Sequence, residues 1–350
     1  MLKRSIEPVD ELPPAPHAPA SGRVALQHLT YLAALARERH FARAADACHV
    51  SQPTLSAGIR RLEQQLGVRL VQRAHQFQGL TPEGERMLDW AHRILTDCDA
   101  MQRDLVAMRH GLSGRLRLGA VPTALPTTSL LTRHLRRRHD AITLTVESLS
   151  PQEIERRLHQ SQLDVGLTYL ENETLLGVRT LPLFRERYLF LTPTSGRHAN
   201  LDVIGWDEAA SAPLCLLTPS TQNRRIVDRA FRAVGAAPQP VVETNSITTL
   251  FAHVRDAGMC AVIAHTWLRV LDLPAELRAI PLVEPDESQP IGLVWLDREP
   301  EPLLARALVT TARATDLQRL VDERAPRLPH RAPGAVAQLA SASASQNRGS

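Results

Sequence analysis

The sequence predicts an α+β protein of several domains: an N-terminal helix-turn-helix, a long linker helix and a C-terminal α/β domain with two subdomains. Residues 41–70 encode two short helices separated by a tight turn, and residues 83–110 keep one helical pattern throughout. After Gly114, runs that alternate apolar and polar residues take turns with helical stretches. This change of period from 3.6 to 2 marks the start of a domain that contains a sheet.

The composition is typical of a globular chain. Its 350 residues are 43% hydrophobic, and a net charge of +4 is too small to identify a nucleic-acid binder by itself. We expect no membrane helix, and the proline-rich start lacks the basic and then apolar pattern of a secretory signal. Cys48, Cys98, Cys215 and Cys260 have no metal-ligand spacing, so we expect no metal site, no disulfide framework and a cytoplasmic location.

The helix-turn-helix is predicted from apolar spacing and helix caps. A first helix over residues 26–39 and a second over 41–47 precede a turn at 48–50. Ser51 is suited to cap a third helix, because its hydroxyl can accept a backbone hydrogen bond of the first turn. Pro53 falls in that turn, where it costs no intrahelical hydrogen bond.

The third helix is expected to read DNA. Its apolar stripe consists of Leu55, Ile59, Leu62 and Leu66. With this stripe packed inward, the polar first turn faces outward, as reading of a major groove requires. Gln52 can pair with adenine through both amide atoms, Thr54 can touch a thymine methyl group, and Arg60 can hold a phosphate. The alternative is a small helical domain whose exposed polar residues only face solvent.

The segment AADACHVSQPTLSAGIRRLEQQLGVRL, followed by GLTPEGERML, resembles the winged helix-turn-helix of LysR-type transcriptional regulators. The resemblance implies that residues 69–80 form the wing and that the chain binds double-stranded promoter DNA and acts on RNA polymerase. The expected DNA-binding residues are Ser51, Gln52, Pro53, Thr54, Ser56, Arg60, Arg61 and Arg73. The pieces ARERHFARAADAC and FQGLTPEGERMLDWAHRI are also similar to a subgroup associated with formate dehydrogenase operons, one candidate set of target genes.

A long helix is expected to begin at Thr81-Pro82-Glu83 and to end before Gly111. Three- and four-residue steps place a narrow seam along it, made of Leu88, Ala91, Leu95, Cys98, Gln102 and Leu105. Such a seam favours pairing of two subunits, and the family resemblance implies a homodimer or homotetramer. The alternative is an amphipathic helix that packs on its own domain.

The C-terminal part is predicted to hold a mostly parallel sheet, because short strands alternate with helical crossovers. The pieces GRLRLGAVPTALP, QLDVGLTY and SITTLFAHVRDAGMCAVIAHTW resemble the effector domain of the same family, whose fold is similar to periplasmic solute-binding proteins. The expected organisation is a tail at 1–24, the DNA-binding domain at 25–82, the linker helix at 83–113, the effector domain at 114–324 and a tail at 325–350. Within the effector domain, we expect subdomain I at about 114–192 and 267–324, and subdomain II at about 193–266.

A ligand is expected where strands end and helices begin, because helix N-termini offer unpaired N–H groups and a positive dipole end. By resemblance, the effector-binding residues are Thr123, Ser150, Gln152, Ser220, Thr221 and Gln222. Each hydroxyl is equally explained as a plain helix cap. Together they favour a small polar or anionic effector such as a carboxylate, and Arg224 or Arg225 can add a counter-charge if it turns into the cleft.

Other functional classes fit less well. The sequence has no GxSxG, no Walker-type loop, no HExxH and no paired CxxC, so we expect no enzyme, cofactor or metal. A solute-binding module would account for the C-terminal part alone, and a nucleoid-type DNA binder without an effector would leave the cleft unused. The sequence therefore predicts a transcription regulator that responds to a small molecule.

Overall fold

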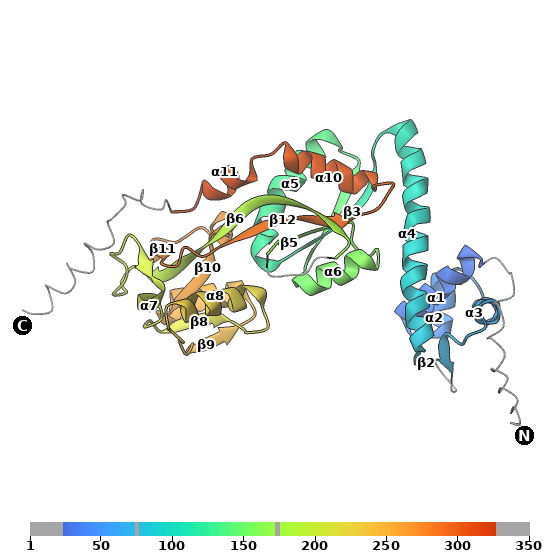
Figure 1. Cartoon of the computed structure of the whole chain (residues 1–350), viewed down its shortest axis with the longest axis horizontal. Coiled ribbons are helices and arrows are strands. Elements are labelled where there is room, and N and C mark those ends of the chain that lie inside the picture. The colour runs from blue at the N-terminus through green and yellow to red at the C-terminus, as the bar shows by residue number, and fades with distance from the viewer. Residues whose placement is uncertain (1–23, 74–76, 172–175, 327–350) are drawn as a thin grey trace, which may run out of the picture. The chain divides into compact units, whose positions relative to one another are not determined.

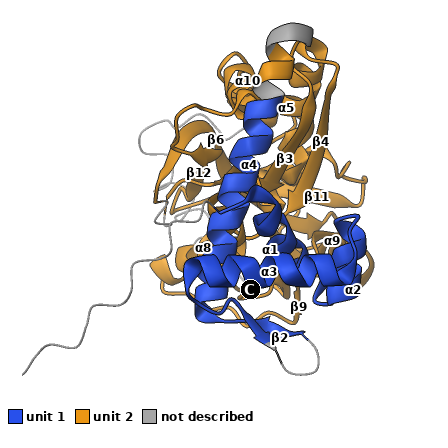
Figure 2. Cartoon of the chain, turned by 90° about the vertical axis from the view of Figure 1, so that its right-hand side faces the viewer, with its two compact units in different colours: residues 1–102 blue, residues 103–350 orange. Residues whose placement is uncertain are grey.

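The computed structural model describes residues 24–73, 77–171 and 176–326, so nearly all of both expected tails lies outside the described residues. The chain divides into two compact units, Met1–Gln102 and Arg103–Ser350 (Figure 2). The division falls inside the linker helix, between the predicted domain boundaries at 82/83 and 113/114.

The first unit contains the predicted helix-turn-helix. It is built from α1 (Leu26–Glu38), α2 (Phe41–Ala47) and α3 (Gln52–Leu66), which confirms the three predicted helices. Gly67 ends α3 with a φ of 68°, in the left-handed region that favours glycine. The apolar faces of the three helices form one core, in which Leu32, Leu55 and Ile59 are fully buried.

The wing is the hairpin that follows α3. Strands β1 (Val71–Arg73) and β2 (Phe77–Leu80) are antiparallel. Residues 74–76 lie outside the described residues. Glu63, on α3, accepts backbone hydrogen bonds from Leu70 at 3.0 Å and from Val71 at 3.2 Å, and this fixes the start of the wing against the third helix.

The linker helix α4 (Pro82–His110) begins and ends as predicted. Thr81 caps it, because its hydroxyl accepts from the Gly84 N–H at 2.9 Å. The predicted seam is wrong at Ala91 and Leu95, which pack against the core of the first unit. Among the α4 side chains that the structure describes, the large apolar ones left exposed are Trp90, Met101, Leu105 and Val106.

The second unit has a sheet with helices packed on it (Figure 1). Its first parallel group is β3 (Gly114–Ala120), β4 (Ile142–Ser148) and β5 (Val165–Tyr169), joined through η1 (Pro122–Ala124), α5 (Leu125–Arg138) and α6 (Pro151–His159). Its second parallel group is β8 (Leu214–Leu217), β9 (Val242–Thr244) and β10 (Cys260–Ala264), joined through α8 (Gln222–Ala233) and α9 (Ile247–Ala257). Short strands thus alternate with helical crossovers, as the sequence predicts.

The two groups are joined by antiparallel strands, so the sheet is mixed and the predicted parallel pairing holds within each group. The strand order is β4-β3-β5-β12-β6-β10-β8-β9. Strand β6 (Val178–Pro193) pairs with β12 (Ser288–Leu296) along its first part and with β10 along its second, always antiparallel (Figure 1). Strand β11 (Leu277–Val283) also pairs antiparallel with the second part of β6, and the expected subdomain bounds stay a prediction.

Short elements complete the second unit. They are β7 (Ile204–Gly205), α7 (Trp206–Ala209), η2 (His265–Arg269), α10 (Leu303–Arg313) and α11 (Leu317–Asp322). Among the described residues, no helix is both long enough and apolar enough to cross a lipid bilayer.

We predict that Gly84→Ala destabilises the first unit. A Cβ at this position would lie 2.0 Å from the Leu70 carbonyl oxygen, so the wing or α4 must shift. Overpacking of this kind costs about 1–3 kcal/mol. Thermal unfolding of the full chain should show a lower first transition than for Arg86→Ala, an exposed position on the same helix. Equal melting of the two variants would contradict the close contact.

Candidate functional site

The DNA-facing candidates lie on the outer side of α3. Gln52, Pro53 and Thr54 are exposed in its first turn, while Leu55 and Ile59 are fully buried beneath them. Among the other predicted DNA-binding residues, Ser51, Arg60 and Arg61 are exposed and Ser56 is half-buried. Arg73 lies at the end of β1, but its side chain is outside what the structure describes.

The first turn of α3 is held by its cap. The Ser51 hydroxyl accepts from the Thr54 N–H at 3.3 Å and bonds the Thr54 hydroxyl at 2.8 Å. Gly58 lies against Tyr31, and a Cβ there would come within 2.6 Å of the Tyr31 ring. A glycine at this position therefore lets α3 pack closely on α1. Sequence reasoning missed this contact, although a glycine inside a helix is a signal for it.

A cavity of about 450 Å³ lies in the second unit, and all the predicted effector residues line it. Thr123 comes from η1, Ser150 and Gln152 from the start of α6, and Ser220, Thr221 and Gln222 from the start of α8. The lining residues that sequence reasoning missed include Tyr169, Asn223, Asn245, Ser246, Ile247 and Trp267. Ser246 caps α9, so this helix too begins at the cavity.

The predicted hydroxyls line the cavity and also act locally. Ser150 accepts from the Glu153 N–H at 3.2 Å, and Thr221 accepts from the Arg224 N–H at 3.3 Å, so both are helix caps. The Thr123 hydroxyl instead bonds the Tyr169 hydroxyl at 3.0 Å. Ser150 and Thr221 therefore cap their helices and line the cavity at the same time.

The two candidate arginines differ in position. Arg224 is buried away from the cavity, where it pairs with Asp228 at 2.7 Å and with Glu243 at 2.6 Å. Arg225 lines the cavity, and its Nε donates to Gln222 Oε1 at 2.8 Å. The sequence did not decide which of the two arginines could balance the charge of an anionic effector. In the structure Arg225 lies where it can do so.

The electrostatic character of the cavity is positive. Helices α6, α8 and α9 all begin at its wall, so the positive ends of their dipoles meet there. Arg225 adds a full positive charge, and no carboxylate occurs among the described lining residues. The arrangement suits a small anion, with hydroxyl and amide groups to orient it and apolar residues such as Trp267 and Leu125 around it.

A buried carboxyl lies behind the cavity wall. Glu186, on β6, is 0% exposed, and its Oε1 accepts from the hydroxyls of Tyr169 at 3.3 Å and Tyr188 at 3.1 Å. Burial raises the pKa of Glu186 to about 7, although hydrogen bonds from Thr123, Tyr188 and Tyr169 oppose the rise. Burial also raises the pKa of both tyrosines, so they stay protonated as donors.

The cysteines lie apart from the cavity lining. Cys215 is fully buried and Cys260 is 5% exposed, and burial raises the pKa of both thiols. A buried thiol of raised pKa is a poor nucleophile, because the thiolate is the reactive form. Across the described ranges, no group of three or more His, Cys, Asp or Glu residues is placed to hold a metal ion.

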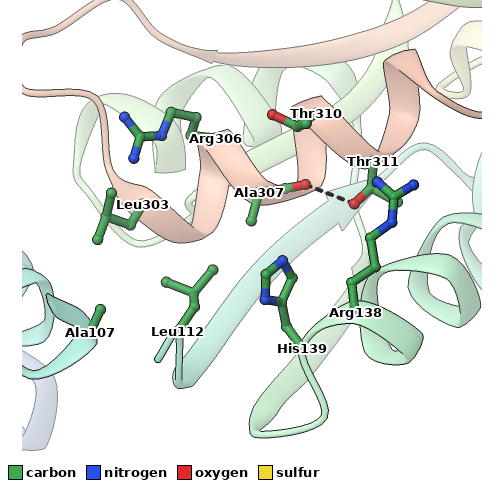
Figure 3. Close-up of a pocket in the computed structure, with 9 residues that line it drawn as sticks. All are labelled: Ala107, Leu112, Arg138, His139, Leu303, Arg306, Ala307, Thr310 and Thr311. Carbon is green, nitrogen blue, oxygen red and sulfur yellow. Dashed lines mark hydrogen bonds between the residues drawn. The ribbon is translucent and has the colours of Figure 1, made fainter. Parts of the chain in front are cut away.

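A second hollow, of about 400 Å³, lies between the end of α5 and α10 (Figure 3). Arg138, His139 and Arg306 surround it, and Leu112 and Leu303 line its apolar part. None of the predicted effector residues lines this hollow.

A helix-turn-helix unit joined to an α/β unit with a ligand-sized cavity is the architecture of a DNA-binding regulator. Residues 26–85 match the family model for the bacterial regulatory helix-turn-helix protein, lysR family, and residues 109–316 match the LysR substrate binding domain. The chain belongs to the LysR family of DNA-binding transcriptional regulators, and it is not an enzyme. The predicted family, its fold and its function class are thus confirmed.

Several relatives share most of the chain. The DNA-binding transcriptional dual regulator OxyR of Escherichia coli strain K12 is 30% identical over 290 residues, which cover 80% of this chain and 92% of OxyR. The regulator XapR of the same strain is 27% identical over 250 residues, which cover 71% of this chain and 85% of XapR.

Solved structures show the same fold. A full-length OxyR variant from Pseudomonas aeruginosa has a TM-score of 0.69 and 26% identity, covering 85% of this chain and all 100% of that one. The regulator CbnR, solved in complex with its target DNA, has a TM-score of 0.63 and 20% identity, covering 83% of this chain and 99% of CbnR.

We predict that Glu186 makes the second unit less stable at high pH. Its folded pKa of about 7 lies above the ordinary value of 4.5, so its contribution to the free energy of unfolding is fully present below pH 4.5 and is lost as the pH rises through 7. The loss amounts to roughly 3 kcal/mol. Urea unfolding at pH 5 and pH 8 should show a smaller fall in stability for Glu186→Gln than for the wild type. An equal fall in both proteins would contradict the raised pKa.

Proposed function

We propose that this regulator binds promoter DNA through α3 and the wing and responds to a small anionic effector in the cavity of its second unit. The observation that carries the proposal is the meeting of three helix starts and Arg225 at one cavity without a lining carboxylate. The confirmed family supports the DNA-binding role, since its helix-turn-helix model spans residues 26–85.

We assign the first turn of α3 to base reading and the arginines to the backbone. Gln52 is exposed and offers an amide that fits adenine, whereas the exposed Thr54 has its hydroxyl engaged by the cap, which leaves its methyl group for a thymine contact. Arg60 and Arg61 are exposed further along α3, where a guanidinium can neutralise phosphate. Ser51, Pro53, Ser56 and Arg73 complete the proposed contact surface.

The proposed assembly is a homodimer or homotetramer. Trp90, Met101, Leu105 and Val106 expose large apolar side chains on α4, with exposed fractions between 49% and 58%. A row of this kind is suited to a partner helix. A dimer would bind a near-palindromic site with two α3 helices. We place the chain in the cytoplasm with promoter DNA and RNA polymerase as partners, because a regulator acts where the chromosome is.

The relatives raise an alternative trigger. Several are named as hydrogen peroxide-inducible genes activators. In this chain Cys215 and Cys260 are buried with raised pKa values, and no cysteine lines the cavity. These facts favour reversible binding of an anion over oxidation of a thiol in the second unit. The target genes, formate dehydrogenase operons included, stay a prediction.

The proposed response is a shift between two conformations. The cavity takes residues from both parallel groups of strands, which β6 and β12 join. A ligand that contacts both groups binds best when they are close together, so it favours a closed form. The closed form would change how paired DNA-binding units lie on the promoter.

We expect Gln52→Ala and Arg60→Ala to differ on DNA. Loss of the amide should weaken specific binding by about 1–3 kcal/mol and relax base preference at one position. Loss of the guanidinium should weaken binding to every sequence and reduce the salt slope by about one. Binding isotherms on specific and random DNA at several salt concentrations separate the two effects. Equal losses on both DNAs for Gln52→Ala would overturn its assignment.

We expect Arg225→Gln to weaken anion binding about tenfold or more, since a charge-assisted hydrogen bond is replaced by a neutral one. Arg232→Gln is the matched control, because Arg232 lies on the same helix and is absent from the cavity lining. Isothermal titration with small carboxylates measures both variants. Unchanged affinity in Arg225→Gln, or an equal loss in the control, would contradict the role of Arg225.

A further inference from the structure

Glu186 occupies the point where the two halves of the sheet meet. Strand β6 changes its pairing partner here. Glu186 lies opposite Gln289 of β12, and Tyr188, two residues later, lies opposite Ala264 of β10. The side chain is 0% exposed. Such a buried acid is rare in proteins unless a charge or a hydrogen-bond network compensates it.

The groups around Glu186 offer hydrogen bonds and no free cation. Tyr169 of β5 and Tyr188 of β6 donate to it, and Thr123 of η1 bonds Tyr169 and is also within hydrogen-bond reach of the carboxyl. The charged and titratable groups on the neighbouring elements are engaged elsewhere. Asp322 accepts hydrogen bonds from the side chains of Arg187 and Gln318. His265 accepts from the backbone N–H of Arg187 and lies 3.4 Å from Asp322. Glu287 accepts from Gln289 and forms an ion pair with Arg229. The negative charge of an ionised Glu186 is thus left without an opposite charge.

A chain of hydrogen bonds connects this carboxyl to the cavity. The relay consists of Glu186, Tyr169 and Thr123, with oxygen separations of 3.3 Å and 3.0 Å. Tyr169 and Thr123 both line the cavity. A hydroxyl has one hydrogen to donate, so the direction of each bond in the relay depends on the state of the carboxyl at its end.

The two states of Glu186 present different atoms to a ligand. When Glu186 is ionised, Tyr169 donates its hydrogen to the carboxylate, so Thr123 donates to Tyr169 or to the carboxylate itself and shows only lone pairs to the cavity. When Glu186 is protonated, it donates to Tyr169, Tyr169 donates to Thr123, and the Thr123 hydrogen is free to donate into the cavity. An anion needs donors and is repelled by a nearby carboxylate, so both effects favour the protonated state.

We propose that the cavity binds its anion together with one proton, which Glu186 takes up, and that the Thr123 hydroxyl donates to the anion only when Glu186 is protonated. This proposal rests on the proposed effector role of the cavity and adds a proton to it. Glu186 acts as a positioning residue, because it reaches the ligand only through Tyr169 and Thr123. The regulator would then sense a small anion and pH jointly.

The sign of the coupling follows from the direction of proton uptake. Below pH 7 Glu186 is already protonated and anion affinity is constant. Above that pH the proton must be taken from solution, so affinity falls by up to about tenfold for each pH unit. Between pH 6 and pH 8.5 the dissociation constant should rise about thirtyfold.

Isothermal titration of the full-length chain with sulfate tests the proposal, because sulfate does not titrate in this range. Ionic strength is held constant with chloride. For the wild type we expect the thirtyfold weakening and uptake of about one proton per sulfate at pH 8.5, measured in two buffers of different ionisation enthalpy. Glu186→Gln should bind at both pH values about as tightly as the wild type does at pH 6, without proton uptake, because its amide donates as the protonated acid does.

Two further variants define the route. Tyr169→Phe breaks the relay and should weaken binding at pH 6 while reducing the pH dependence. Glu287→Gln removes a neighbouring carboxylate outside the relay and should keep the full dependence. Wild-type proton uptake needs no variant to fold, so an uptake of zero at pH 8.5 would overturn the proposal by itself. An unchanged pH dependence in Glu186→Gln would also overturn it.

The outcomes also separate this proposal from the one on which it rests. Absence of sulfate binding at both pH values would refute an anion site and the proton coupling together, while DNA binding by gel shift would still support the regulator. Sulfate binding that does not depend on pH would refute the proton coupling alone and leave the anionic effector in place.

Discussion

The second unit depends on the antiparallel strand β6, because this strand belongs to both groups of parallel strands. Its first part pairs with β12 and its second part with β10 and β11. The helices that follow the parallel strands therefore begin near one another, with Ser150, Thr221 and Ser246 as their caps. The cavity and its positive character are consequences of this shared strand.

The residues at the cavity serve stability and recognition at once. A capping hydroxyl must lie at a helix start, and a helix start is where an anion finds unpaired N–H groups. Ser150 and Thr221 thus keep their caps and still line the cavity. Arg224 shows the opposite case, since its ion pairs with Asp228 and Glu243 hold it away from the cavity. The free charge at the site is supplied by its neighbour, Arg225.

Much of this architecture could be predicted from the sequence, because local signals carry it. Caps and apolar spacing located α3 and α4, a period-2 run located β3, and short apolar runs between helical stretches located β8 and β10. The antiparallel role of β6 could not be predicted in this way, because pairing between distant strands has no local signal. The spacing of Ala91 on α4 predicts an apolar face but does not say whether a second subunit or the core of the same unit covers it, and in the structure the core covers it. Glu186 was missed because a charged residue in a strand reads as exposed until its partners, Tyr169 and Tyr188, are known.

The central claim is that a ligand-controlled regulator reads a defined DNA site. A footprint of the full-length protein on the DNA upstream of its own gene, with and without small carboxylates and inorganic anions, tests it most directly. The account predicts protection of a near-palindromic site whose pattern changes when one anion is added. Salt-sensitive coating of the DNA without a defined site, unchanged by every anion, would contradict it and would favour a nucleoid-type DNA binder.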